Sequence, residues 1–294
     1  MSYTVWSQWD DLEVPAGFKK LSPSNAPIDR ADLSEISFYV PTYMSGKTGL
    51  EFVNHMKDLK VLQMPNAGYE DALPYVRDGV TLCNARGVHD ASTAELAIGL
   101  AIGARRGFAD FAKAQAEGNW AHLRYQSLSD SKIAIIGAGS IGQTLRKYLS
   151  VYDVEITNFS RNGENKIVDF DKKISQFDIV FLVLPLNDES KNFMNKERIF
   201  KMKPGATLVN VARGPIVNTE ALIEALNSGH ISAGLDVTDP EPLPADHPLW
   251  SAKNCVITPH VGGDSTAFDS RCKKLVEEQL KRLAANQPLI NVVI

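Results

Sequence analysis

The chain has 294 residues, a formal net charge of −4 at pH 7 and a hydrophobic content of 44%. This length is enough for two domains that each bury a core, and the negative charge argues against nucleic acid or an anionic membrane as the partner. The three cysteines form no CxxC pair, and neither a signal peptide nor a long apolar run is present. These features predict a cytoplasmic protein without a metal site, a disulfide framework or a membrane span.

The first part of the chain, up to about residue 91, predicts a small α/β unit. Buried strands are expected at Phe38–Pro41 and Lys60–Met64, and helices at Gly49–Lys57 and Glu70–Arg77. The segment AELAIGLAIGARRG then carries apolar residues on nearly every face, with Ser92 or Thr93 as the expected N-cap. We expect this helix to be buried and to lead from the first domain into the second.

The segment KIAIIGAGSIG, from Lys132 to Gly142, joins a short apolar run directly to the glycine pattern GxGxxG. Gly137 permits a tight turn, Gly139 lets the backbone approach a pyrophosphate, and Gly142 lets the next helix pack against the strand. The first amides of that helix, at Ser140 and Ile141, would face the phosphates at the positive end of the helix dipole. This strand–turn–helix setting favours dinucleotide binding over a plain structural turn.

From Lys132 onward, strands and helices alternate, which predicts a Rossmann-type doubly wound parallel sheet. The expected strands are Lys132–Ile136, Val154–Asn158, Asp178–Leu184, Thr207–Asn210, Ala233–Asp236 and Val256–Thr258. The expected helices are Ile141–Val151, Lys196–Lys201, Thr219–Ser228 and Ala267–Asn286. Because the last helix follows the final strand, we expect it to return to the first domain. The first domain would then comprise residues 1–91 and 266–294, and the second residues 92–265.

The end of the second predicted strand of the sheet bears on the choice of cofactor. The strand VEITNF is followed by Ser160 and Arg161, and no carboxylate stands where NAD-binding folds hold the ribose 2′-hydroxyl. Ser160 could hydrogen-bond to a 2′-phosphate, and Arg161 could pair with it. We therefore expect NADP(H) to be preferred, with NAD as a second usable cofactor. The alternative is that Arg161 is a solvated arginine in a surface turn.

Three charged residues follow strands in the second half of the predicted sheet: Arg213 after LVNVA, Glu241 after GLDVTDP and His260 after VITP. Ligands bind beyond the carboxyl ends of parallel strands, so the three could face one crevice. Each alone could be a loop charge, a solvated glutamate or a turn-capping histidine. Together they predict reduction of a 2-oxo acid by a nicotinamide. Arg213 would orient its carboxylate, and His260, kept charged by Glu241, would protonate the alkoxide.

From about residue 60, the sequence resembles the D-isomer-specific 2-hydroxyacid dehydrogenases. The resemblance lies in the order and spacing of QMPNAGYED, NARGVHDASTAELAIGL, IIGAGSIG, FLVLPLNDESKNFMN, MKPGATLVNVARGPIVNTEAL, GLDVTDPEPLPADHPLW and VITPHVGG. It implies an enzyme like glyoxylate/hydroxypyruvate reductase or glycerate dehydrogenase. It also implies a flavodoxin-like substrate domain, a cleft between that domain and the dinucleotide-binding domain, and a homodimer.

The resemblance implies further site residues. Backbone amides around Ala67 and Gly68, with Asn66 nearby, would bind the substrate carboxylate. Residues at strand ends would line the cofactor site together with Arg213 and His260: Leu184, Pro185, Val211, Ala212, Asp236 and Gly262. The chain departs from the family pattern PLTPET by reading PLNDES, with Asn187 for Thr and Asp188 for Pro, in a segment that lines the nicotinamide side.

The leading functional prediction is an NADP(H)-dependent reductase of a small 2-oxo acid such as glyoxylate or hydroxypyruvate. Lactate and phosphoglycerate dehydrogenation are related activities. Formate dehydrogenases share the architecture, but they carry Gln where this chain has Glu241, because formate oxidation moves only a hydride. The alternative from another class is a dinucleotide-sensing, co-repressor-like protein without turnover.

Overall fold

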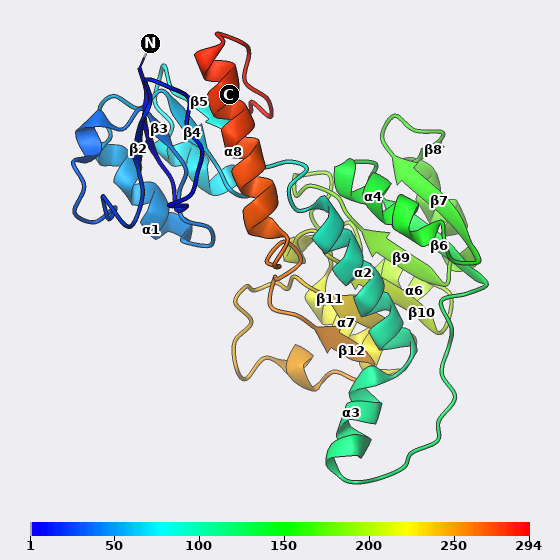
Figure 1. Ribbon diagram of the computed structural model, residues 1–294. Coiled ribbons are helices and arrows are strands. Elements are labelled where there is room, and N and C mark those ends of the chain that lie inside the picture. The colour runs from blue at the N-terminus through cyan, green and yellow to red at the C-terminus, as the bar shows by residue number, and fades with distance from the viewer. Residues whose placement is uncertain (1) are drawn as a thin grey trace. The chain divides into compact units, whose positions relative to one another are not determined.

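The computed structural model describes residues 2–294, and in this range the chain divides into two compact units (Figure 1). One unit comprises residues 2–89 and 266–294, and the other comprises residues 90–265. The sequence predicted breaks after residues 91 and 265, and the units divide after residues 89 and 265. Among the described residues, no helix is both long enough and apolar enough to span a bilayer.

The unit of residues 90–265 contains one parallel sheet with the strand order β12-β11-β10-β9-β6-β7-β8. The strands are β6 Ser131–Ile136, β7 Val154–Ser160, β8 Asn165–Lys166, β9 Ile179–Leu182, β10 Ala206–Asn210, β11 Ile231–Leu235 and β12 Cys255–Ile257. The first of them, β6, pairs with both β7 and β9, so the strand order reverses at β6. This is the switch point at which ligands bind in doubly wound sheets.

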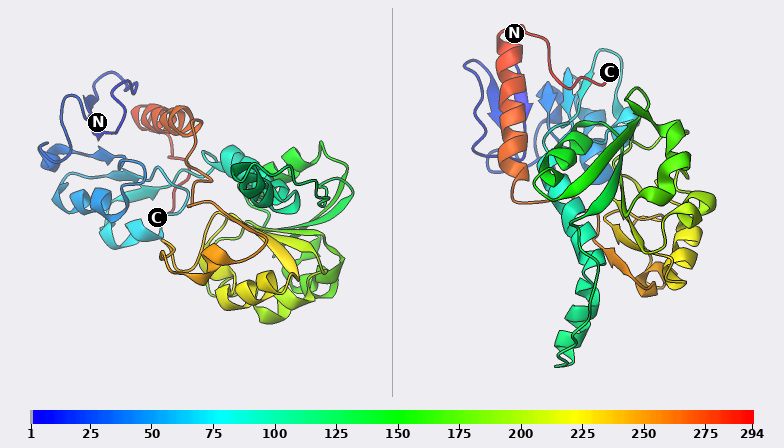
Figure 2. Two further views of the ribbon diagram at one scale, coloured as in Figure 1. Left: turned by 90° about the horizontal axis from the view of Figure 1, so that it is seen from below. Right: turned by 90° about the vertical axis from the view of Figure 1, so that its right-hand side faces the viewer.

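Helices cover both faces of this sheet (Figure 2). On one face lie α2 Asp90–Arg105 and α4 Ser140–Leu149, and on the other α6 Lys196–Lys201 and α7 Thr219–Asn227. The unit also contains the helices α3 Phe108–Ala116 and α5 Phe170–Lys173. Side chains alternate between two cores along β6, where Ile133 and Ile135 pack with α2 and α4, and Ala134 and Ile136 with the other face. The predicted Rossmann-type sheet is therefore confirmed.

The predicted N-cap of the buried helix is wrong. The helix α2 begins at Asp90, so Ser92 and Thr93 lie inside it. The apolar character of the segment was interpreted correctly, because α2 packs against α4, β10 and β11. Contact with the sheet is close: a Cβ added at Gly234 on β11 would meet the Cβ of Leu100 at 2.8 Å.

The unit of residues 2–89 and 266–294 has a second parallel sheet, in the order β2-β1-β3-β4-β5. Its strands are β1 Thr4–Trp6, β2 Lys19–Leu21, β3 Phe38–Tyr39, β4 Val61–Gln63 and β5 Thr81–Cys83. This is the flavodoxin order, which confirms the fold that the family resemblance implied. The helix α8 Phe268–Ala284 packs on the core that contains Phe38, and α1 Gly46–Glu51 contributes to the other core.

Several elements of this smaller unit escaped prediction. The strands β1, β2 and β5 span only three residues each, which is too short for an apolar alternation to be visible. The helix expected at Glu70–Arg77 is a 3₁₀ helix, Glu70–Tyr75, that contains Pro74. Proline removes a backbone donor, and this favours a short, irregular turn over a full α-helix.

A buried pair of glutamine side chains connects the two ends of the chain. Gln63 on β4 and Gln279 on α8 are both fully buried. Gln279 Nε2 donates hydrogen bonds to Gln63 Oε1 at 2.9 Å and to the carbonyl of Ile290 at 2.7 Å. Buried amides require such partners, so these bonds fix the returning helix and the C-terminal segment on the first sheet.

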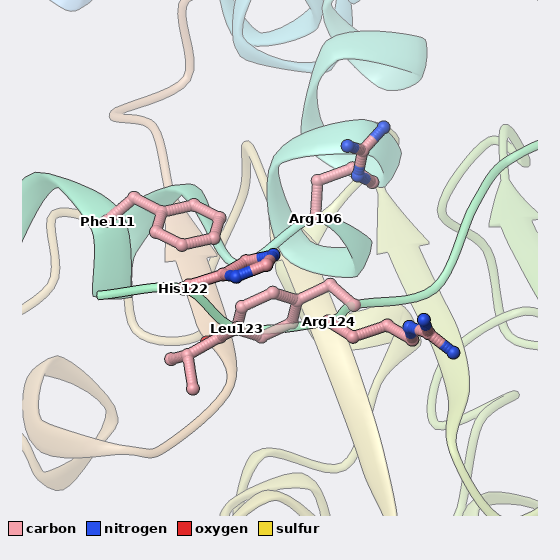
Figure 3. A pocket seen from close by; sticks show the side chains of 6 residues that line it. Arg106, Phe111, His122, Leu123 and Arg124 are labelled. Atoms are coloured by element: carbon pink, nitrogen blue, oxygen red, sulfur yellow. The ribbon is translucent and has the colours of Figure 1, made fainter. Parts of the chain in front are cut away.

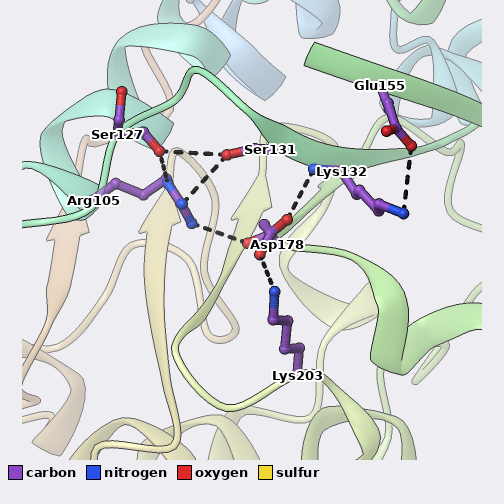
Figure 4. A network of polar contacts seen from close by, with 7 residues as sticks. All are labelled: Arg105, Ser127, Ser131, Lys132, Glu155, Asp178 and Lys203. Atoms are coloured by element: carbon purple, nitrogen blue, oxygen red, sulfur yellow. Dashed lines mark hydrogen bonds and ion pairs between the residues drawn. The ribbon is translucent and has the colours of Figure 1, made fainter. Parts of the chain in front are cut away.

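A buried arginine fixes the amino-terminal edge of the larger sheet (Figure 4). Arg105, at the end of α2, donates from Nε to the carbonyl of Ser127 at 2.9 Å and from Nη1 to the carbonyl of Asp178 at 3.2 Å. The carboxylate of Asp178 accepts from the amide of Lys132 and pairs with Lys203 at 2.7 Å. The network joins α2 to the starts of β6 and β9. Because it lies at the amino ends of these strands, their carboxyl ends remain available to form a site.

Candidate functional site

The glycine turn after β6 has the geometry of a phosphate cradle. Gly137 has a φ of +121°, and a Cβ added there would meet the carbonyl oxygen of Val183 at 2.5 Å. A Cβ at Gly142 would meet the carbonyl oxygen of Gly137 at 2.4 Å, so only glycine allows α4 to start this close to the strand. Gly139, in contrast, faces open space, with nothing within 4 Å of an added Cβ. The backbone there is accessible to a ligand.

The start of α4 also suits an anionic group. Its N-cap residue is Gly139, which has no side chain to cap the helix. The amides of the first turn, which include those of Ser140 and Ile141, therefore receive no hydrogen bond from the N-cap side chain. The Ser140 hydroxyl donates to Asp90 Oδ1 at 3.1 Å. The turn and the helix start thus fit the pyrophosphate of a dinucleotide.

The end of β7 carries the residues expected to select the cofactor. Ser160 is the last residue of the strand, and Arg161 follows it with its side chain 67% exposed. The structure adds a residue that the sequence did not reveal: Glu189, beyond β9, places Oε2 3.6 Å from Nη1 of Arg161. The prediction that no carboxylate stands at the strand tip is correct for the local sequence, but a carboxylate reaches that tip from another loop.

The loop after β9 departs from the family pattern, but it forms a turn that is stabilised by several hydrogen bonds. Asn187 Oδ1 accepts hydrogen bonds from the amides of Glu189 and Ser190, each at 3.0 Å. The hydroxyl of Ser190 donates to the carbonyl of Pro185 at 2.6 Å and accepts from the amide of Asn187 at 2.8 Å. Asn187 therefore forms the side-chain-to-backbone bonds of an Asx turn. Leu184, which precedes the turn, packs against the core of the sheet.

The loop after β10 is shaped by Asn210, which the sequence analysis did not single out. This side chain is 1% exposed; it donates from Nδ2 to the carbonyl of Arg213 at 3.0 Å and accepts from the amide of Ala212 at 3.1 Å. Val211 and Ala212 are buried, so their packing anchors the start of the loop. The guanidinium of Arg213 donates from Nη1 to the carbonyl of Ala212 at 2.7 Å.

Asp236 fixes the turn that carries His260. Its buried carboxylate accepts from the Thr258 hydroxyl at 2.6 Å and from the amides of Val261 and Gly262, each at 2.9 Å. His260 has a φ of +55°, in the left-handed region, and its amide donates to the carbonyl of Asp236 at 2.7 Å. The carboxylate of Asp236, expected at the cofactor, thus forms its bonds within the turn and holds an unusual backbone conformation.

His260 and Glu241 are hydrogen-bonded partners, as their positions after β12 and β11 predicted. The His260 Nδ1 to Glu241 Oε1 distance is 2.5 Å. This hydrogen bond raises the pKa of His260 above its ordinary value, against burial, which lowers it. Burial alone would raise the pKa of Glu241, but the hydrogen bond and charge of His260 outweigh it and lower that pKa. The charge of Arg213 lowers the pKa of both groups.

Asn66, Ala67 and Gly68 follow β4 in the smaller unit and form a partly buried turn there. The turn is held through its backbone carbonyls: the amide of Ala85 donates to the carbonyl of Asn66, and the side-chain Nδ2 of Asn84 donates to the carbonyl of Ala67, each at 2.8 Å. Asn66 Oδ1 is buried and accepts no hydrogen bond from any of the residues 2–294 that the structure describes. A buried acceptor without a partner is unfavourable, so this oxygen is available to a donor from a ligand.

Among the described residues, His, Cys, Asp and Glu side chains form no group of three or more suited to a metal ion. A cavity of about 230 Å³ lies beside α3 (Figure 3) and is lined by Arg106, Phe111, His122, Leu123, Arg124 and Tyr125. It adjoins the end of α2 that Arg105 anchors at the amino ends of the strands, and it contains none of the predicted site residues.

A glycine turn of this geometry at the switch point of a doubly wound sheet defines a dinucleotide-binding protein. Comparison with known proteins gives the family. The family model for the NAD binding domain of D-isomer specific 2-hydroxyacid dehydrogenases matches residues 98–262. A glyoxylate reductase from Thermofilum pendens is 32% identical over 255 residues, covering 81% of this chain and 75% of the relative.

Two further relatives agree with this match. The glyoxylate reductase/hydroxypyruvate reductase of Homo sapiens is 33% identical over 224 residues, covering 70% of this chain and 68% of the relative. A solved structure of a family protein from Aeromonas salmonicida has a TM-score of 0.86 at 26% identity, covering 99% of each chain. The chain belongs to the D-isomer specific 2-hydroxyacid dehydrogenase family. It is therefore an oxidoreductase with a nicotinamide dinucleotide as its cofactor.

Proposed function

We propose that the protein reduces a small 2-oxo acid, such as glyoxylate or hydroxypyruvate, to the D-2-hydroxy acid with NADP(H). The observation that carries the proposal is the His260–Glu241 hydrogen bond of 2.5 Å, with Arg213 close enough to influence the pKa of both residues. A histidine held charged by a carboxylate beside an arginine supplies a proton donor and a carboxylate anchor together.

In this proposal, each of the three residues has a separate task. The nicotinamide, when bound, supplies the hydride. Arg213 pairs with the substrate carboxylate and orients the neighbouring carbonyl. Because Glu241 occupies Nδ1 of His260, Nε2 is the nitrogen that donates a proton to the carbonyl oxygen as negative charge develops. Glu241 stabilises the charged imidazole before the transfer and keeps the ring orientation fixed.

The turn of the smaller unit is proposed to contribute to substrate binding. The amides around Ala67 and Gly68 would hold the carboxylate, and Asn66 Oδ1 would accept from a donor on the substrate. This assignment is supported by the burial of that oxygen and by its lack of a hydrogen-bond donor within the described part of the chain. Residues 1–91 with 266–294 would then form the substrate-binding domain, and residues 92–265 the dinucleotide-binding domain.

Steady-state rates with a panel of 2-oxo acids and both cofactors test this function. We expect NADPH oxidation with glyoxylate or hydroxypyruvate and slower oxidation of NADH. Tight NADPH binding without turnover on any member of the panel would instead support the alternative, a dinucleotide-sensing protein of the co-repressor type.

The pKa of His260 leads to a prediction about pH. The hydrogen bond to Glu241 raises this pKa, so the protonated acid needed for reduction persists to higher pH than an unpaired histidine would allow. Reduction should be fastest below the raised pKa and fall as the pH rises through it, whereas oxidation should show the opposite trend. In Glu241→Gln, the descending limb of the reduction profile should move to lower pH. A profile of kcat/KM against pH in both enzymes checks this, and identical limbs would contradict the pairing.

Cofactor preference gives a second prediction. Arg161→Ala should weaken NADPH about tenfold while changing NADH less than about twofold, because only NADPH carries the 2′-phosphate. Dissociation constants from the change in nicotinamide fluorescence measure both effects. Arg146→Ala is the control, since Arg146 is another exposed arginine of this unit, bonded to Asn158 Oδ1 at 2.9 Å. Equal weakening of both cofactors would remove Arg161 from phosphate recognition.

We also infer a cytoplasmic homodimer. The three cysteines are free thiols, and burial raises the pKa of Cys83 to about 11, so its thiol is unreactive at neutral pH. The region around α3 exposes large apolar side chains that association could cover: Phe108 at 58%, Trp120 at 96% and Leu123 at 53%. Sedimentation of the purified protein tests the dimer.

A further inference from the structure

The tip of β7 carries an ion pair rather than an isolated cation. Arg161 Nη1 lies 3.6 Å from Glu189 Oε2, and both side chains are largely exposed, at 67% and 74%. The two residues come from the loops that follow β7 and β9, the two strands that flank β6 in the sheet. The loops therefore meet beside the glycine turn that follows β6, where the adenosine part of a dinucleotide binds.

The position of Glu189 is fixed by the turn beneath it. Its amide donates to Asn187 Oδ1 at 3.0 Å, and the hydroxyl of Ser190, a residue only 5% exposed, donates to the carbonyl of Pro185 at 2.6 Å. These bonds close the loop on itself. The backbone that carries Glu189 is thus held in place, which keeps its side chain beside the tip of β7.

We propose that Glu189 is a specificity-determining residue that opposes the 2′-phosphate of NADP(H). The proposal rests on the proposed function, in which Arg161 pairs with that phosphate. A phosphate of about −1.5 to −2 charges that approaches Arg161 must displace the Glu189 carboxylate or lie near it. Both outcomes weaken binding, because one loses an ion pair and the other places like charges together. NADH, which has a neutral 2′-hydroxyl, meets no such opposition.

The opposing effects of Arg161 and Glu189 on the 2′-phosphate then set the ratio of the NADPH affinity to the NADH affinity. Glu189→Gln keeps the size of the side chain and removes only its charge. At low ionic strength, we expect it to tighten NADPH about three- to tenfold, the scale of like-charge repulsion across solvent-exposed distances, and to change NADH less than about twofold. The gain should shrink at high salt, since exposed charges are screened.

Equilibrium binding of NADPH and NADH to the wild type, Glu189→Gln and Arg161→Ala, each at low and high salt, tests the proposal. The matched control is Glu197→Gln, which removes an equally exposed carboxylate, one that pairs with Lys201 on α6 at 2.7 Å. If net charge alone governed affinity, the control and Glu189→Gln would tighten NADPH equally, and this would overturn the proposal. Unchanged NADPH affinity in Glu189→Gln would overturn it as well.

The two proposals fail in different ways. If Arg161→Ala weakens NADPH selectively while Glu189→Gln has no effect, phosphate recognition by Arg161 stands and the role of Glu189 is lost. If Arg161→Ala weakens both cofactors equally, the proposed NADP(H) preference itself is lost. Selective tightening of NADPH in Glu189→Gln, absent from Glu197→Gln, supports the assignment of Glu189.

Discussion

The His260→Ala enzyme is expected to transfer hydride about 10²- to 10⁴-fold more slowly than the wild type, which is the usual contribution of a positioned general acid. His260 is the proposed proton donor, and because its Nδ1 is occupied by Glu241 at 2.5 Å, Nε2 is the nitrogen that would donate. Without it, the alkoxide that forms at the former carbonyl carbon must take its proton from water. The measurement is single-turnover oxidation of bound NADPH after mixing with glyoxylate.

The control for this variant is His55→Ala. His55 is an exposed histidine at the end of a short 3₁₀ helix of the smaller unit, and it is none of the predicted site residues. Its replacement should leave the single-turnover rate within about twofold of the wild type, as expected for a surface substitution. NADPH affinity should change little in either variant. A His260→Ala enzyme with an unchanged rate of hydride transfer would exclude the acid role.

The second large effect is expected at Arg213. Arg213→Lys keeps the positive charge but loses the planar pair of donors that matches a carboxylate, so kcat/KM should fall about 10²- to 10³-fold. The loop position should be retained, because Asn210 binds the backbone carbonyl at residue 213 and not the side chain. The loss should therefore appear in substrate kinetics, while the dissociation constant of NADPH stays nearly constant.

Arg146→Lys provides the matched substitution, since Arg146 on α4 bonds to Asn158 Oδ1 and to the carbonyl of Ile156 on β7. It should leave kcat/KM within about twofold. Steady-state kinetics with glyoxylate distinguish the two variants. If Arg213→Lys retained full activity, a point charge would suffice and bidentate orientation of the substrate would be excluded.

The sequence reveals much of the site because its chemistry is tied to strand ends. Parallel strands bring their carboxyl ends to one edge, so Glu241 and His260, distant along the chain, could be predicted as partners, and the structure places them in hydrogen-bond contact. The glycine turn could also be predicted from the sequence, because each of its glycines meets a different steric requirement. Gly137 and Gly142 meet backbone atoms, whereas Gly139 faces open space.

Other features of the site depend on contacts between distant segments of the chain, which no local sequence pattern indicates. Glu189 reaches Arg161 from a loop two strands away in the sheet, so a search of the β7 tip alone could not find it. Asn210 and Asp236 act through hydrogen bonds to the backbone of the loops that carry Arg213 and His260. Such bonds depend on where the loops lie after folding, and residue type alone does not indicate them.

The pH dependence of single-turnover NADPH oxidation by glyoxylate is the sharpest test of the role proposed for the His260–Glu241 pair. In this role, Glu241 keeps His260 protonated so that the histidine can act as the acid. The rate should be high at low pH and fall as the pH passes the raised pKa of His260, whereas His260→Ala should show a slow, nearly flat profile. A wild-type rate that is independent of pH, or that rises with pH, would exclude the role.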